Sequence, residues 1–298
     1  MRKEDFCFED FYTLLVDKVN SFLEGNGKVG KVLVKEVVKG NDSVKKAMCF
    51  DGGYEVSPVI YLDMVYNRLD QENFNSIVES VCDMLINGGK AIEKSDVLDR
   101  LTHEGVKDNL TFRIINKEMN AKYLENKVYR DYLDLAIIYQ VCVSVGDDKG
   151  RVVITKELAE TLNYSEEELF GMAMTNTPRL YPVSDSSLLE ALGGMLPFDD
   201  TDSMPDPIRV LSNEEKVFGA SVLLYPGIVE KLYKEYGCRY VIPSSLHEVL
   251  IVDHNADPRS YLQMVREVNS TVVEAEDILS NSVYEITKDG LLIAATAA

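Results

Sequence analysis

Tight turns between strand-like segments constrain the fold of this chain more than any other feature of its sequence. Residues 28–38 alternate between two faces, the turn Gly40-Asn41-Asp42 follows, and Val44–Phe50 is strand-like again. Further hairpins are predicted around Gly146-Asp147-Asp148 and around Asp289-Gly290. Strands joined by such short turns pair antiparallel, because a parallel pair needs a crossover of about a dozen residues or more. The pattern therefore favours largely antiparallel sheets.

Helical segments separate these strands. Phe8–Leu23 places apolar residues three and four positions apart, which is typical of one face of a helix. We expect Glu72–Leu85 to be helical and to end at Asn87-Gly88-Gly89, since Gly and Asn tolerate the left-handed cap. Ser165-Glu166-Glu167-Glu168 has the pattern of a capping box at the start of a helix. Pro258 is placed to begin a last helix.

The remaining segments complete the predicted fold. We expect helices at Asn116–Leu124 and Asp185–Leu192, an exposed loop at Gly193–Arg209 and a strand at Ala220–Tyr225. The interleaving of strands and helices predicts an α+β fold with mixed, largely antiparallel sheets and flanking helices. A soft boundary divides the chain into an N-terminal α/β lobe, residues 1–105, and a C-terminal α+β lobe, residues 106–298. A single integrated domain is the alternative.

The charge of the chain narrows the classes of partner. Its 31 Lys and Arg stand against 50 Asp and Glu, which gives a formal net charge of −19. An acidic surface repels phosphate backbones and anionic lipid headgroups, so we expect neither nucleic acid nor a membrane as partner. The sequence has no membrane-length apolar run, no signal-peptide pattern, and no Cys-x-x-Cys pair among its five cysteines. We therefore expect a cytoplasmic protein with reduced thiols.

The common cofactor and metal motifs are missing. Gly-x-x-x-x-Gly-Lys-Ser/Thr does not occur, and there is no Gly-x-Ser-x-Gly elbow. Gly25, Gly27 and Gly30 match Gly-x-Gly-x-x-Gly in letters only, because they follow a predicted helix and precede a predicted strand, whereas the dinucleotide motif follows a strand and opens a helix. His247-Glu248 does not extend to His-Glu-x-x-His, because Ile251 stands at the fifth position. Residues 183–215 are acidic, but Asp199-Asp200-Thr201-Asp202 lacks the EF-hand pattern, and we expect a solvated loop. The sequence predicts no cofactor and no metal site.

The segment that follows Pro243 carries the residues best suited to catalysis. Ser244 and Ser245 lie at a predicted strand–turn–strand junction, where polar side chains project past the sheet edge. Either serine with His247 matches the nucleophile and base of a hydrolase, and Glu248 is the candidate carboxylate. The same residues suit a turn, because serine after proline is good turn chemistry. We favour the turn.

A second polar cluster begins at Asn116. Asn116 and Asn120 are four positions apart and share one face of the predicted helix. Arg130, Asp131 and Asp134 follow a few residues later. These side chains are candidates for holding a small ligand or a peptide backbone. The favoured alternative is that Asn116 caps the helix and that the others form a solvated face.

Six stretches occur in a recognisable order along the chain. They are Ser57–Tyr66, Ile115–Asn120, Tyr129–Ala136, Gly219–Pro226, Pro243–Val249 and Met264–Asn269. Over about residues 10–287 the sequence resembles the bacterial domain of unknown function family 5688, found in anaerobic Gram-positive bacteria. One departure is Gln71-Glu72, where the family usually has a Gly. The resemblance implies a bacterial cytoplasmic protein and no established activity, and its segments include the serine–histidine and asparagine clusters.

Three functions are compatible with the sequence. The leading hypothesis is a non-enzymatic module or adaptor that binds another protein, because the chemical motifs are missing while the surface is acidic. The second is a hydrolase-like enzyme that uses His247 with Ser244 or Ser245. The third is a small-molecule sensor with a pocket between the two lobes. The sequence leaves the oligomeric state open.

Overall fold

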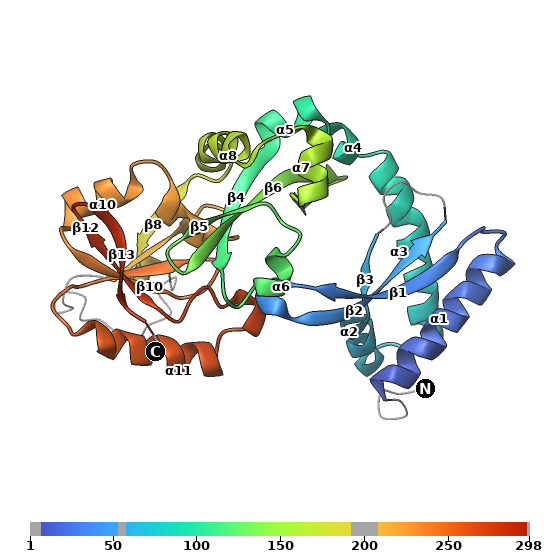
Figure 1. Ribbon diagram of the computed structural model, residues 1–298. Helices are drawn as coiled ribbons and strands as arrows, with labels where there is room; N and C mark the ends of the chain where they lie inside the picture. Colours follow the sequence, from blue (N-terminus) through green and yellow to red (C-terminus); the bar gives the residue numbers. More distant parts are fainter. Residues whose placement is uncertain (1–6, 53–57, 192–207, 297–298) are drawn as a thin grey trace. The chain divides into compact units, whose positions relative to one another are not determined.

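The computed structural model describes residues 7–52, 58–191 and 208–296 (Figure 1). The chain forms two compact units, and each is described by itself. The first unit comprises residues 1–39, 43–102 and 143–150, and the second comprises residues 40–42, 103–142 and 151–298. The predicted loop at Gly193–Arg209, apart from its last two residues, lies outside the described residues, as do Asp199–Asp202.

The first unit packs helices against a small antiparallel sheet. Strands β1 (Lys31–Val38), β2 (Val44–Asp51) and β3 (Ile60–Tyr61) lie in this order. The helices are α1 (Phe8–Gly25), α2 (Leu62–Asn67), α3 (Phe74–Glu93) and α4 (Val97–Arg100). The predicted hairpin is confirmed, with Lys31 paired to Asp51 and Val38 to Val44. The apolar face of α1 packs with α3 in one buried core (Figure 1).

The predicted end of the helix before residue 90 is wrong. α3 continues through Gly88 and Gly89 to Glu93. Glycine inside a helix costs about 1 kcal/mol relative to alanine, but here it permits close packing. A Cβ on Gly88 would come within 3.1 Å of the Pro58 side chain, and Gly89 is buried. These glycines therefore serve close contact rather than helix termination.

The second unit contains most of a four-stranded sheet, of which residues 143–150 are assigned to the first unit. Its strands are β4 (Leu110–Asn116), β5 (Tyr129–Tyr132), β6 (Leu135–Val145) and β7 (Asp148–Val153). The order is β4-β6-β5, and β7 also pairs with β6. Both β4 and β5 run antiparallel to β6. The predicted turn at Gly146-Asp147-Asp148 joins β6 to β7, and Gly146 takes a positive φ of 63° there.

A six-stranded antiparallel sheet completes this unit, in the order β13-β12-β10-β11-β9-β8. The strands are β8 (Val183–Ser187), β9 (Arg209–Asn213), β10 (Arg239–Pro243), β11 (Val249–Val252), β12 (Val283–Thr287) and β13 (Gly290–Ala295). The helices of the unit are α5 (His103–Asn109), α6 (Ala121–Leu124), α7 (Lys156–Leu162), α8 (Glu166–Leu180), α9 (Leu188–Ala191), α10 (Ile228–Tyr236) and α11 (Pro258–Thr271). α11 packs on β10, β12 and β13, and α10 packs on β12 and β13 (Figure 1). The predicted α+β class with largely antiparallel sheets is confirmed.

Hydroxyl groups close the free edge of β4. The backbone N–H of Phe112 donates to Thr177 Oγ1 of α8 at 3.0 Å, and that of Ile114 donates to Ser221 Oγ at 3.2 Å. An unpaired strand edge invites pairing with another chain, so these side chains satisfy donors that a neighbouring strand would otherwise take. They also fix β4, which ends at Asn116, against the rest of the unit.

Three predicted elements are wrong. Ala220–Tyr225 is the 3₁₀ helix η5 (Gly219–Leu224) rather than a strand, because a short, wholly buried apolar run has no periodicity that separates the two. Of the predicted helix Asp185–Leu192, residues 185–187 belong to β8 and residues 188–191 to α9, and Leu192 lies outside the described residues. Asn116 ends a strand, and the helix that follows begins only at Ala121. The capping box at Ser165 is confirmed at the start of α8.

No helix among the described residues has both the length and the apolar character that a membrane crossing requires.

Candidate functional site

A cavity of about 750 Å³ lies within the second unit, and we call it the asparagine cavity. Its wall is formed by the end of β4, α6, β5, the turn between β5 and β6, and the residues that flank β12 and β13. Its chief polar lining residues are Asn116, Lys117, Glu118, Tyr129, Asp134 and Asn281. Ligand sites typically have volumes of about 300–1,000 Å³, so the cavity has the size of a binding site.

The side-chain oxygen of Asn116 has a hydrogen-bond partner, whereas its side-chain nitrogen has none among the described residues. Its Oδ1 accepts the backbone N–H of Met119 at 2.9 Å, which closes the turn between β4 and α6. Its side-chain amide nitrogen has no protein partner among the described residues, although the residue is only 5% exposed. A buried amide normally finds a partner. Because Asn116 lines the cavity, a ligand carbonyl or carboxylate is the natural acceptor for its two N–H groups.

Asn120 holds the cavity wall in place rather than lining it. This fully buried side chain exchanges two hydrogen bonds of 2.7 Å with Asn41, and it also donates to the carbonyl of Asn116. Asp42 accepts the backbone N–H groups of Lys122 and Tyr123 and so caps α6. The predicted pairing of Asn116 with Asn120 therefore exists, but through a turn rather than on a helix face.

Asp134 is the centre of a hydroxyl cluster in the cavity wall. Its carboxylate accepts hydrogen bonds from Ser280 at 2.6 Å, Ser282 at 2.9 Å and Tyr284 at 2.8 Å. Burial and the neighbouring charge of Asp134 raise the pKa of Tyr284 well above its usual value of 10.0, so the phenol remains a donor. The cluster joins the turn between β5 and β6 to the segment that leads into β12.

Asn281 resembles Asn116 in its hydrogen bonding. Its Oδ1 accepts from Asn269 Nδ2 of α11 at 2.9 Å, while its own amide nitrogen has no partner in the described parts of the chain. The sequence analysis missed Asn281 and Tyr129. A signal was available in Ser280-Asn281-Ser282, three polar residues directly before an apolar strand.

Asp131 and Arg130 have other partners outside the cavity. Asp131 forms an ion pair with Lys117 at 2.7 Å on the surface. Lys117 itself also lines the cavity. Arg130 forms two hydrogen bonds with Glu166 at 2.9 and 2.7 Å, contacts Glu167, and lies 3.8 Å from the centre of the Phe170 ring. Arg130 thus ties β5 to α8, and the structure separates it from the asparagines with which it was grouped.

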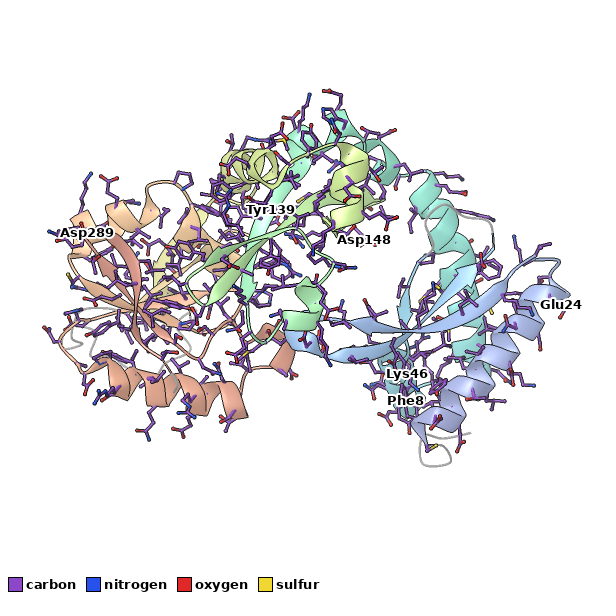
Figure 2. All side chains as sticks on the ribbon, viewed as in Figure 1. Phe8, Glu24, Lys46, Tyr139, Asp148 and Asp289 are labelled. Atoms are coloured by element: carbon purple, nitrogen blue, oxygen red, sulfur yellow. The ribbon has the colours of Figure 1, made fainter. Side chains whose placement is uncertain are left out.

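The Arg130 contact predicts a pH-dependent contribution to stability. Burial opposes ionisation of Glu166, but hydrogen bonds from Arg130 and from Tyr139 (Figure 2) outweigh burial and lower the pKa of Glu166 below 4.5. A lowered pKa in the folded state stabilises the fold above the unfolded-state pKa, and this stability is lost as the pH falls through the folded-state pKa. We expect Glu166→Gln to lower the free energy of unfolding by about 2 kcal/mol at pH 7.

Urea unfolding at pH 7 and pH 3 measures this effect. The difference between Glu166→Gln and the parent protein should shrink at the lower pH, because protonation of Glu166 in the parent removes the charge that the glutamine variant lacks. Glu167→Gln is the matched control, because the Glu167 side chain is 80% exposed and should contribute little at either pH. Equal differences at both pH values for Glu166→Gln would contradict the assignment.

The serine–histidine segment forms the connection between β10 and β11. His247 Nδ1 accepts the backbone N–H of Phe218 at 3.3 Å, and Nε2 lies 3.4 Å from Asp277. Ser245 Oγ accepts the backbone N–H of His247 at 3.0 Å, which is a turn contact. Within the described structure, neither Ser244 nor Ser245 hydrogen-bonds the imidazole, and the Glu248 side chain has no hydrogen bond. The geometry thus places a turn here and forms no nucleophile–base pair.

No group of three or more His, Cys, Asp or Glu side chains suited to a metal ion occurs among the residues that the structure describes.

The family of the chain follows from its sequence as a whole. No curated protein and no solved structure matches it. The sequence model of a family of unknown function, DUF5688, matches residues 8–288 of 298, which confirms the resemblance noted above. The protein therefore belongs to the family of unknown function DUF5688.

Proposed function

We propose that this chain is a peptide-binding protein whose asparagine cavity holds an extended segment, either a free short peptide or part of a partner protein. The observation that carries the proposal is the amide of Asn116, a residue only 5% exposed, whose oxygen is fixed and whose nitrogen has no partner within the described residues. The equivalent nitrogen of Asn281 adds a second donor in the same cavity. Main-chain carbonyl groups are acceptors of the kind that both amides lack.

The other lining residues complement a peptide rather than a polyanion. The carboxylates of Glu118 and Asp134 are acceptors for main-chain N–H groups or an N-terminal ammonium. Lys117, the one cation among the described lining residues, is already paired with Asp131. Met119, Ala121 and Leu124 supply an apolar wall for a ligand side chain. A highly charged anion would meet net negative charge here, whereas a peptide backbone matches donors and acceptors together.

The proposed setting is the bacterial cytoplasm. None of the five cysteines forms a disulfide in the structure, as expected in a reducing compartment. A peptide segment of another protein would make the chain an adaptor, whereas free peptides would make it a sensor of peptides.

Thermal shift and calorimetric titration with a panel of ligands test the proposal. The panel comprises capped tetrapeptides, free amino acids, monosaccharides and nucleotides. We expect at least one class of capped tetrapeptide to bind, and we expect binding to weaken at least tenfold, or about 1.4 kcal/mol, in Asn116→Asp. This variant keeps an oxygen that caps Met119, removes the two free N–H donors and adds one negative charge.

Matched variants separate binding from structure. Asn281→Asp keeps the acceptor for Asn269 and loses the corresponding donors, so it should weaken the same peptides. Gln263→Glu adds one negative charge on exposed α11 and should leave the affinity unchanged. Binding of amino acids, sugars or nucleotides in place of peptides would overturn the peptide assignment, and so would peptide binding that both asparagine variants retain.

A further inference from the structure

Two arginine side chains contact the same aromatic ring, and one of them extends from β4 on the face opposite to that of Asn116. Side chains alternate along a strand, so Thr111 and Arg113 point away from the face that carries Asn116. The guanidinium carbon of Arg113 lies 4.2 Å from the centre of the Phe218 ring, and that of Arg151, from β7, lies 5.4 Å from the same centre. We call Arg113 and Arg151 the arginine pair.

Among the described residues, Arg113 has no carboxylate partner, and Arg151 has only a long ion pair with Glu215. Arg113 has one polar contact, from Nη2 to the hydroxyl of Tyr123 at 3.3 Å, and it forms no ion pair in the described parts of the chain. Arg151 contacts Tyr181 at 3.3 Å and lies 4.0 Å from Glu215. The Nε atoms of both arginines are buried without a partner within the described structure. An uncompensated buried charge is costly.

The electrostatics of the pair are unfavourable in the absence of an anion. Burial lowers the pKa of Arg113, and the charge of Arg151 adds to the decrease. Burial also lowers the pKa of Lys127, whose ammonium lies 5.1 Å from the centre of the Tyr123 ring. The whole chain carries a net charge of −19, so carboxylates are abundant elsewhere. Cations whose pKa is lowered by burial mark candidate functional sites when they also share a contact, as Arg113 and Arg151 do on the Phe218 ring.

The surroundings of the pair contain further polar groups without full partners. Gln140 lies opposite Thr111 on β6, is 3% exposed, and has a side-chain amide with no hydrogen-bond partner among the described residues. Phe218 has a positive φ of 53°, which is unusual for a bulky residue and tends to occur at functional sites. Donors therefore gather around the arginine pair, and the backbone that presents the Phe218 ring is strained.

We propose that the arginine pair binds the phosphoryl group of a small phosphorylated ligand. A guanidinium presents planar pairs of N–H groups that match the oxygens of a phosphate, and two such forks suit a dianion. The phosphate supplies the negative charge that Arg113 lacks, and Gln140 and Tyr123 offer additional hydrogen bonds. This site is separate from the asparagine cavity, because neither Arg113 nor Arg151 lines that cavity.

Calorimetric titration of the full chain with inorganic phosphate, at constant ionic strength set with sodium chloride, tests the proposal. We expect saturable binding at one site, weakened at least tenfold in Arg113→Met and in Arg151→Met. Arg266→Met removes one positive charge from exposed α11 and should leave binding unchanged. Asn116→Asp should also leave phosphate binding unchanged, which distinguishes failure of this site from failure of the peptide cavity.

A second readout separates a ligand site from a structural role. Without phosphate, Arg113→Met should melt at the same temperature as the parent or higher, because it removes an uncompensated buried charge. A lower melting temperature together with unchanged phosphate affinity would overturn the proposal. Arg113→Lys keeps the positive charge but lacks the planar pair of N–H groups of a guanidinium, so it should weaken phosphate binding. This variant serves as the test if the methionine variants do not fold. The proposal is also overturned if phosphate does not bind, or if succinate binds and phosphate does not.

Discussion

Asp134→Ala is expected to lower the free energy of unfolding by about 3–5 kcal/mol. The carboxylate of Asp134 is the shared acceptor for the hydroxyls of Ser280, Ser282 and Tyr284, all of which are buried. Without this carboxylate, three buried hydroxyls lose their hydrogen-bond acceptor. Each buried polar group left without a partner lowers the stability of the fold by about 1–3 kcal/mol. The cost is large because residues distant in the sequence meet through this one side chain.

Urea unfolding of Asp134→Ala, Asp131→Ala and Tyr284→Phe measures the effect. Asp131 is the matched control, since it is a nearby carboxylate of the same segment, 60% exposed and paired with Lys117 on the surface. Its replacement should leave the unfolding midpoint nearly unchanged. In the double variant Asp134→Ala/Tyr284→Phe, the tyrosine replacement should lower the free energy of unfolding by less than it does alone. The reason is that the acceptor of the Tyr284 hydroxyl is already missing. Similar midpoints for the Asp134 and Asp131 variants would contradict the role of the hydroxyl cluster.

Gly219→Ala is expected to produce the second large effect, a loss of about 3 kcal/mol or more. A Cβ at this position would lie 2.0 Å from Ser212 Oγ and 2.4 Å from the carbonyl oxygen of His247. Ser212 donates to that carbonyl at 2.7 Å, so neither atom can move without breaking the contact between β9 and the β10–β11 turn. The start of η5 would therefore have to shift away from β9.

The same substitution at Gly171 provides the control. Gly171 lies inside α8 and is exposed, and a Cβ added there would meet no atom within 4 Å. Alanine has the higher helix propensity, so Gly171→Ala should stabilise the protein by about 0.5–1 kcal/mol. Thermal melts of the two variants should move in opposite directions. A Gly219→Ala variant as stable as the parent would show that η5 does not pack as described.

The sequence is sufficient for most of the local structure in this chain. The helix period of α1, the β1–β2 hairpin and the capping box of α8 depend on neighbouring residues, and each is predicted correctly. The predictions at Gly88 and Ala220 are wrong because the roles of these residues depend on atoms far along the chain. Glycine as a packing residue and glycine as a helix stop look alike in a sequence.

In the candidate site, too, contacts between residues close in the sequence are predictable, and contacts between distant residues are not. Asn116 and Asp134 are close in the sequence, and both line the asparagine cavity as their grouping predicts. Arg130 belongs to the same predicted group but binds Glu166 of α8 instead. The partners of Asp134 come about 150 residues later, and no local pattern links them to it. Arg113 does carry a local signal, since it is the one charged residue of the largely buried strand β4.

The measurement that tests the peptide-binding proposal most directly is methionine-methyl NMR of the full chain, titrated with the tightest capped tetrapeptide of the panel. Met119 lines the asparagine cavity, whereas Met174 lines a separate cavity of about 340 Å³ in the same unit. Met119→Leu and Met174→Leu assign the two resonances. The proposal predicts that the peptide shifts the Met119 resonance to saturation and leaves the Met174 resonance in place. A saturating peptide that leaves Met119 unmoved, or a panel in which no peptide moves it, would contradict the proposal.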